Sequence, residues 1–125
     1  MTKKKAIHYD QNLIRALRKL PSPIRDVRHN LTVYLDDRQA RSNQSRFEHI
    51  ARNFHELTVK DIESIPKGIV LESKLKKDKV RKDTYNYYFP RKRNDGRFIK
   101  ISIKIEDYEK RTAIIKTIFV AKMTK

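Results

Sequence analysis

The sequence predicts an α+β fold, in which N-terminal helices pack on an antiparallel sheet of about four strands. Apolar residues recur near the helical period between residues 11 and 20 and again between residues 47 and 54. Residues 99–105 instead alternate isoleucine with lysine or serine, which is the pattern of a strand with one buried face. The residues Asn94-Asp95-Gly96 precede that strand and are typical of a hairpin turn. A length of 125 residues suits one domain.

The first helix is placed by its cap and by the prolines that follow it. Asp10 can cap a helix over residues 11–19, and Pro21-Ser22-Pro23 ends it. Residues 24–36 combine the start of a helical turn with β-branched and aromatic side chains, so both structures stay open there. Residues 36–44 have no apolar period and are expected to form a loop or a frayed helix.

A second helix is predicted to begin after Ser45. Ser45 and Glu48, three residues on, form the pattern of a capping box. The apolar residues that share one face of this helix are Phe47, Ile50, Ala51 and Phe54. We expect that face to pack on a sheet.

A short third helix is predicted over residues 59–65, because Thr58 and Asp61 repeat the capping pattern. Pro66 and Gly68 are expected to end it. All later segments indicate strands or the turns between them.

The predicted strands occupy the second half of the chain. Residues 69–71 form a short strand, a charged segment follows over 73–83, and the tyrosine-rich residues 84–89 form the next strand. After the isoleucine strand, a turn at residues 107–110 leads into the last strand over 112–122.

Positive charge dominates the composition. The formal net charge is +16, from 31 Lys and Arg against 15 Asp and Glu. Residues 1–66 carry 13 basic and 8 acidic side chains, a net of +5, while residues 67–125 carry 18 and 7, a net of +11. A strongly basic chain commonly binds nucleic acid, an acidic protein or an anionic membrane surface.

The composition also excludes several kinds of chemistry. With no cysteine, the chain has no disulfide, no thiolate nucleophile and no cysteine-ligated metal. Two glycines cannot form a glycine-rich phosphate loop, and no cofactor is implied. The basic N-terminus lacks the apolar run of a secretory signal, and no segment is apolar enough to span a membrane. We therefore expect a soluble cytoplasmic protein that does not bind membranes.

A block of basic residues followed by aromatic residues is the strongest functional signal. The block comprises Lys74, Lys76, Lys77, Lys79, Arg81 and Lys82, followed by Tyr85, Tyr87, Tyr88, Phe89, Arg91, Lys92 and Arg93. Cations that neutralise phosphates beside rings that stack on bases favour the binding of single-stranded nucleic acid. The alternative is a solvated lysine loop, followed by tyrosines half buried in the core.

Two histidines are candidates for proton transfer. His49 and His55 lie six residues apart on the second helix, roughly 120° apart around its axis, so they cannot share one metal ion as an i,i+4 pair would. His55 lies at the margin of the apolar face, whereas His49 points away from it. Either histidine could equally be a solvated or helix-terminal residue. Separately, the sequence shows no pair of carboxylates at a catalytic spacing.

Residues 47–66 contain a His-Ile pair, a basic residue, a second histidine and an Asp-Ile-x-x-Ile turn. This segment resembles a helix of phage and mobile-element proteins in the barnase, EndoU, colicin-nuclease and RelE-like superfamily of endoribonucleases. Residues 85–92, 98–104 and 114–119 resemble its consecutive antiparallel strands. The resemblance covers residues 44–122 as a nuclease-like α+β core and leaves residues 1–43 as an N-terminal helical extension.

The resemblance implies a metal-independent, toxin-like endoribonuclease, in which an RNA 2′-hydroxyl attacks the adjacent phosphorus and leaves a cyclic phosphate. The catalytic candidates are His49, His55, Arg81, Arg91, Lys100, Lys116 and Thr117. The glutamate base of barnase has no obvious counterpart in this chain. The alternative is a non-catalytic phage or mobile-element regulator that binds nucleic acid or inhibits a nuclease. Besides RNA, an acidic protein such as an antitoxin or immunity protein is an expected partner.

Overall fold

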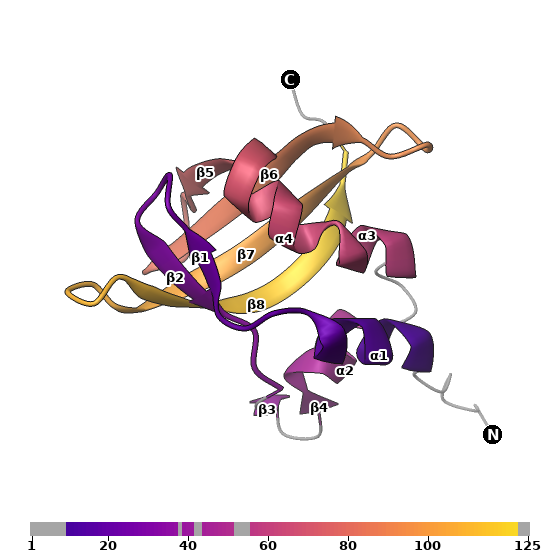
Figure 1. Cartoon of the computed structure of the whole chain (residues 1–125), viewed down its shortest axis with the longest axis horizontal. Coiled ribbons are helices and arrows are strands. Elements are labelled where there is room, and N and C mark those ends of the chain that lie inside the picture. The colour runs from indigo at the N-terminus through magenta and orange to yellow at the C-terminus, as the bar shows by residue number, and fades with distance from the viewer. Residues whose placement is uncertain (1–9, 38, 42–43, 52–55, 123–125) are drawn as a thin grey trace.

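A curled six-stranded sheet with helices on one face forms the protein (Figure 1). The computed structural model describes residues 10–37, 39–41, 44–51 and 56–122. The strands of the sheet are β1 (Ile24–Asp26), β2 (Leu31–Tyr34), β5 (Lys74–Lys77), β6 (Thr84–Lys92), β7 (Phe98–Asp107) and β8 (Thr112–Ala121). Strands β3 (Gln39–Arg41) and β4 (Gln44–Ser45) pair separately. The helices are α1 (Gln11–Lys19), α2 (Arg46–Ile50), α3 (Val59–Glu63), α4 (Ile65–Lys67) and the π-helical turn η2 (Gly68–Glu72).

The α+β class is confirmed, but the expected sheet of about four antiparallel strands is wrong. The order is β1-β2-β8-β7-β6-β5, and β2 runs parallel to β8, with Val33 opposite Ala113. The first 43 residues are therefore not a purely helical extension, because β1 and β2 join the same sheet as the C-terminal strand. Strand β5 lies inside the charged segment expected to be a loop. Pairing with distant strands, which local sequence does not encode, stabilises these short segments.

Side-chain caps begin the helices as predicted. The Asp10 carboxylate accepts hydrogen bonds from the backbone N–H groups of Asn12 at 2.9 Å and Leu13 at 3.3 Å, which starts α1. Two capping boxes follow, formed by Ser45 with Glu48 and by Thr58 with Asp61. Phe54, which was expected on the apolar face of α2, lies outside the described residues.

The helix that begins at Val59 continues, with a turn at Ser64, to Glu72, so the predicted stop at Pro66 and the strand over residues 69–71 are both wrong. Pro66 lies in the first turn of α4, where the missing N–H removes no helical hydrogen bond. Gly68 has helical dihedrals and packs against Phe89, so closely that a Cβ at this position would lie 2.2 Å from the ring. Burial against β6 therefore overrides the strand propensity of the next residues.

The core lies between the helices and one face of the sheet. The alternation predicted for residues 99–105 is confirmed, since all four isoleucines are buried. Fully buried side chains from the helices and from β8 meet them there: Leu17, Ile50, Ile62, Ile65, Ile69, Ile115 and Ile118. The other face of β7 is left to lysine and serine.

A buried polar cluster joins the β1–β2 hairpin to β6. Asp26 is fully buried and accepts a hydrogen bond from the Tyr87 hydroxyl and another from His29 Nδ1, each at 2.7 Å. Burial, followed by the Asp26 carboxylate, raises the pKa of Tyr87. Arg28 donates to the carbonyl oxygens of Ile69 and Ser73 at 2.9 and 3.0 Å. These bonds hold the hairpin against η2 and the sheet.

Tyr87→Phe is expected to lower the free energy of unfolding by about 1–3 kcal/mol, because Asp26 loses a buried donor. Urea denaturation measures this change. Tyr88→Phe, one residue along on the opposite face of β6, is the matched control and should shift stability by no more than about 0.5 kcal/mol. Equal losses in the two variants would contradict the role of the Asp26 cluster.

Gly68→Ala is expected to destabilise the fold by about 1–3 kcal/mol, although alanine is the better helix former, because the new methyl group meets the Phe89 ring. Thermal unfolding of Gly68→Ala, Phe89→Leu and the double variant tests the contact. The smaller leucine should leave room for the methyl group, so the double variant should lose less than the two single losses combined. Strict additivity would show that the contact does not limit stability.

Candidate nucleic-acid interface

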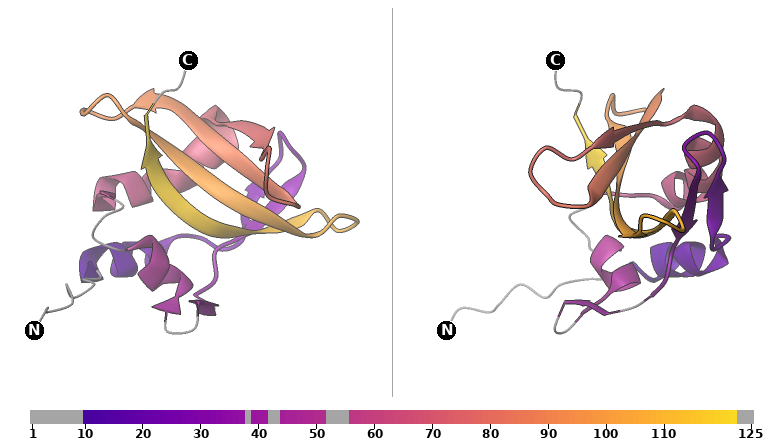
Figure 2. Two further views of the ribbon diagram at one scale, coloured as in Figure 1. Left: turned by 180° about the vertical axis from the view of Figure 1, so that it is seen from behind. Right: turned by 90° about the vertical axis from the view of Figure 1, so that its left-hand side faces the viewer.

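The face of the sheet opposite the helices carries the candidate site. In the left view of Figure 2, strands β6, β7 and β8 cross in front of the helices that cover their other face. Side chains alternate between the two faces of a strand, so the strand register defines which residues share the open face. Lys100, Ser102 and Lys104 of β7 lie on it, since the isoleucines between them point into the core.

Two rows of side chains run across the open face. In the aromatic row, neighbouring strands place Lys74, Tyr88, Lys100 and Phe119 side by side. In the hydroxyl row, they place Lys76, Asn86, Ser102 and Thr117 side by side. The rows are two residues apart along each strand, which is about 6.8 Å.

Cations and rings interleave along the aromatic row. Lys100 Nζ lies 5.4 Å from the centroid of the Tyr88 ring and 5.0 Å from that of Phe119. Lys76 Nζ, in the hydroxyl row, lies 5.8 Å from the Tyr88 centroid. Cation–π attraction holds the ammonium groups over the rings. The same arrangement offers an incoming strand both a stacking surface and charge for its phosphates.

A hollow of about 350 Å³ opens in the middle of this face, where the β5–β6 loop projects beside the sheet (Figure 2, right). It is lined by Asp78, Val80, Arg81, Asn86, Lys100, Ser102 and Phe119. Asp78 shapes the loop: it accepts hydrogen bonds from the N–H groups of Val80 and Arg81, each at 2.9 Å, and from Asn86 Nδ2 at 3.1 Å. These bonds lower the pKa of Asp78, led by the one from Arg81. The carboxylate therefore holds Arg81 at the hollow.

A β-bulge adds Lys116 to the same region. Ser102 pairs with Thr117 and Ile103 with Ile115, which leaves Lys116 as the extra residue of β8. Burial, followed by the charges of Lys104, Arg81 and Arg46, lowers the pKa of Lys116. Like charges from four separate segments are thus brought close enough to repel one another.

Helix α2 lies against β8 at the bulge. Arg46 Nη1 donates a hydrogen bond to the carbonyl oxygen of Lys116 at 3.1 Å. His49 follows Arg46 by three residues, so the two share one side of the helix, and the His49 side chain is half-buried. The bond from Arg46 brings the start of α2 to β8, and His49 lies one helical turn further along. His55, the second histidine candidate, lies outside the described residues.

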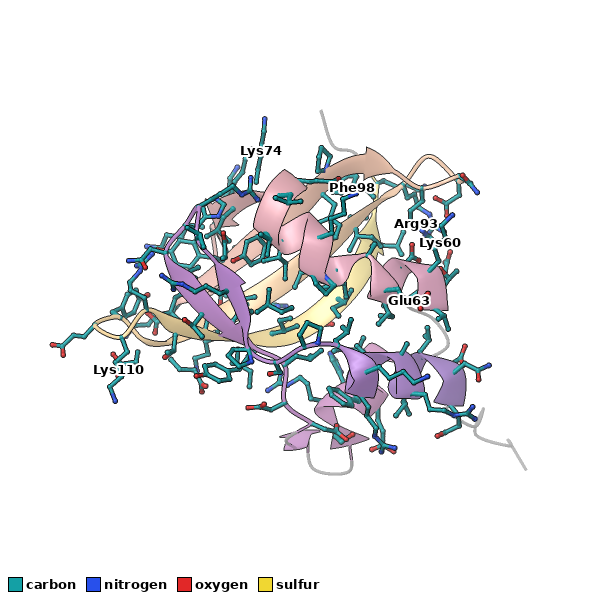
Figure 3. The ribbon with its side chains drawn as sticks, in the orientation of Figure 1. Lys60, Glu63, Lys74, Arg93, Phe98 and Lys110 are labelled. Carbon is teal, nitrogen blue, oxygen red and sulfur yellow. The ribbon has the colours of Figure 1, made fainter. Side chains whose placement is uncertain are left out.

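The structure brings together some of the predicted site residues and separates others. Those on or beside the open face are Lys74, Lys76, Arg81, Tyr88, Lys100, Lys116 and Thr117. Lys74 projects from the sheet edge in Figure 3. Lys79 and Lys82 are exposed in the β5–β6 loop. The side chains of Arg91 and Lys92 lie outside the described part of the chain.

Five residues of the basic and aromatic block do not lie on the open face, and one of them is Phe89, which packs against Gly68. Tyr87 is fully buried and cannot stack on a base, and Tyr85 packs against the core from the same side of β6. Lys77 pairs with Tyr85 and so also lies on the helix side of the sheet. Arg93 is at the far end of β6, beside Lys60 of α3 in Figure 3, and its guanidinium lies 3.3 Å from the Asp61 carboxylate. The structure therefore separates these residues from the open face, and burial keeps Tyr87 from stacking on a base.

Several residues of the site are absent from the predicted set. They are Arg46, Asn86, Phe98, Ser102, Lys104 and Phe119. The sequence contains a signal for three of them: Phe98, Ser102 and Lys104 are spaced by two residues along β7 with Lys100, so they share its outward face. Arg46 gives no such signal, since its contact with β8 spans 70 residues of the chain.

A second hollow, of about 660 Å³, lies between α3 and the β6–β7 hairpin. Its lining is balanced in charge: three cations, Lys60, Lys67 and Arg93, accompany three carboxylates, Asp61, Glu72 and Asp95. Arg93 contacts two of these carboxylates, those of Asp61 and Asp95. The open face, in contrast, carries an excess of cations. The open face is accordingly the better candidate for binding an anion.

No described helix is long and apolar enough to cross a membrane. Within the described ranges, no three His, Asp or Glu side chains are grouped so that they could hold a metal ion. No family model, curated protein or solved structure matches the chain.

Proposed function

We propose that the open face binds single-stranded RNA in the cytoplasm. The observation that carries this proposal is the row in which Lys100 lies between the rings of Tyr88 and Phe119. Bases stack on exposed rings only when they are unpaired, so this row favours a single strand over a duplex. The lysines on either side are placed to neutralise the phosphates that connect the stacked bases.

We propose further that the protein cleaves the RNA that it binds, as a toxin-like endoribonuclease of the superfamily that the sequence resembles. The ribose 2′-oxygen attacks the adjacent phosphorus and the bond from phosphorus to the 5′-oxygen breaks. A base takes the 2′-hydroxyl proton and an acid protonates the leaving 5′-oxygen. The products are a 2′,3′-cyclic phosphate and a 5′-hydroxyl, and no metal ion is required.

His49 and Lys116 are the acid–base candidates in this reaction. The bond from Arg46 to the Lys116 carbonyl supports this choice, because it brings the start of α2 to the bulge and His49 follows Arg46 by three residues. Burial and neighbouring cations lower the pKa of Lys116, so its neutral amine is more accessible than that of an exposed lysine, as proton transfer requires. Arg81 and Lys100 line the hollow and neutralise the charge that develops on the phosphoryl oxygens.

One observation favours the alternative, a non-catalytic regulator that binds nucleic acid or inhibits a nuclease. Asp78 is the sole carboxylate among the described residues lining the open-face hollow. Its oxygens already accept three hydrogen bonds and its pKa is lowered, so it is a poor general base. A binding protein needs the cations and rings of the face but not a base.

RNA affinity should fall steeply with salt, and the slope should depend on the open-face lysines. On a single strand each neutralised phosphate contributes about −0.7 to the slope of log K against log salt concentration. Lys76→Ala with Lys100→Ala should therefore reduce the slope by about 1.4 units, measured by fluorescence anisotropy with a labelled oligonucleotide. Lys77→Ala with Lys110→Ala removes the same charge elsewhere and is the matched control. Equal slopes for the two double variants would place the RNA on another surface.

Cleavage should proceed in EDTA, yield 2′,3′-cyclic phosphate ends and stop when the ribose at the cut site is 2′-deoxy. His49→Ala should slow cleavage about 10²–10⁴-fold while leaving RNA affinity near that of the wild type. Gel analysis of end-labelled RNA measures the rate. If wild-type protein binds RNA and leaves it intact, the regulator alternative replaces the enzyme. If it binds only acidic proteins, with salt-sensitive affinity, both RNA proposals fail.

A further inference from the structure

Two buried hydroxyl groups on the open face have no hydrogen-bond partner. Ser102 of β7 and Thr117 of β8 are directly opposite each other in the hydroxyl row, and Ser102 is only 1% exposed. Within the described part of the chain, neither Ser102 Oγ nor Thr117 Oγ1 makes a hydrogen bond. A buried hydroxyl left in this state has lost its hydrogen bonds to water without replacing them, which destabilises the fold. Two of them side by side indicate a place where a ligand supplies the missing acceptors.

The residues around this hydroxyl pair favour a negatively charged ligand. Ser102 lines the hollow together with Arg81 and Lys100, both long and flexible side chains. Lys116 is next to Thr117 in the bulge. Burial, followed by the charges of Lys104 and Arg81, lowers the pKa of Lys116. Among the described residues that line the hollow, Asp78 supplies the carboxylate, and the loop backbone and Asn86 engage it. Two hydroxyl donors surrounded by cationic side chains favour a ligand with negatively charged oxygen atoms.

Resting on the proposed function, we propose that the hydroxyls of Ser102 and Thr117 donate hydrogen bonds to the non-bridging oxygens of one internal phosphodiester of the bound RNA. Lys100, Arg81 and Lys116 surround that phosphate and neutralise it.

The spacing of the two rows gives this phosphate its place in the strand. The rings of Tyr88 and Phe119 lie about 6.8 Å along the strands from the hydroxyl pair, which is within the reach of a single nucleotide. A base stacked on the aromatic row therefore belongs to the nucleotide whose phosphate lies on the hydroxyl row. The hydroxyl pair fixes which nucleotide lies on the aromatic row. The outer lysines attract phosphates without fixing the position of the strand.

The test compares wild-type protein with the double variant Ser102→Ala, Thr117→Val. The ligand is a 2′-O-methyl hexanucleotide, which lacks the nucleophilic hydroxyl and stays intact. Loss of two hydrogen bonds to a charged group should weaken binding about 10- to 100-fold. The slope of log K against log salt should stay at the wild-type value, because no charge is removed. Thr112→Val, at the start of β8, is the matched control and should bind as wild type.

Each outcome decides between the proposals. Wild-type affinity in the double variant overturns the phosphate pocket and leaves RNA binding by the face intact. A loss confined to a hexanucleotide carrying a 5′-phosphate also overturns it, because the pocket then holds a terminal phosphate. Absence of binding by the wild-type protein overturns both proposals. The double variant should unfold at a urea concentration no lower than wild type, since the hydroxyls contribute no bond to the fold; a marked loss of stability would show that their role is structural.

Discussion

The antiparallel register of β7 with β8 is the constraint on which the rest of the structure depends. It buries Ile101 and Ile103 against the helices and leaves Lys100 and Ser102 on the opposite face. A slip of one residue would bury the lysines and expose the isoleucines to water, so both faces oppose it. The core and the candidate site are therefore two consequences of one pairing.

The same register concentrates like charge, which opposes folding on that face. Burial lowers the pKa of Lys116, and the charges of Lys104, Arg81 and Arg46 lower it further. The buried isoleucine core on the other side offsets the repulsion, as does the cluster in which Asp26 joins the β1–β2 hairpin to Tyr87. An anion bound at the open face would relieve the repulsion, so ligand binding and stability are coupled.

Under the proposed function, the residues that would bind RNA and those that would cleave it occupy different parts of the open face. The rings and Lys100 form the aromatic row, whereas Thr117, Lys116 and the contact from Arg46 of α2 lie at the bulge. A binding protein needs the first set, and an endoribonuclease needs both. An acidic protein partner would compete with RNA for the same cations, as expected of an inhibitor that covers a nucleic-acid site.

The sequence by itself determined the local elements. Asp10 and the two capping boxes placed the starts of α1, α2 and α3, and the isoleucine alternation placed β7 with its inner face, because these signals lie within a few residues of one another. The basic block favoured nucleic acid as a partner, although two of its three tyrosines, Tyr85 and Tyr87, lie on the helix side of the sheet.

Only the tertiary structure decided the strand order, the helical path through η2 and the composition of the site. The parallel pairing of β2 with β8, the contact of Gly68 with Phe89 and the bond from Arg46 to Lys116 all join segments distant in the chain. Ser102 and Thr117 became partners through the β7–β8 register and its bulge. Such juxtapositions depend on which distant segments bury each other's apolar faces, and no local pattern of residues carries that information.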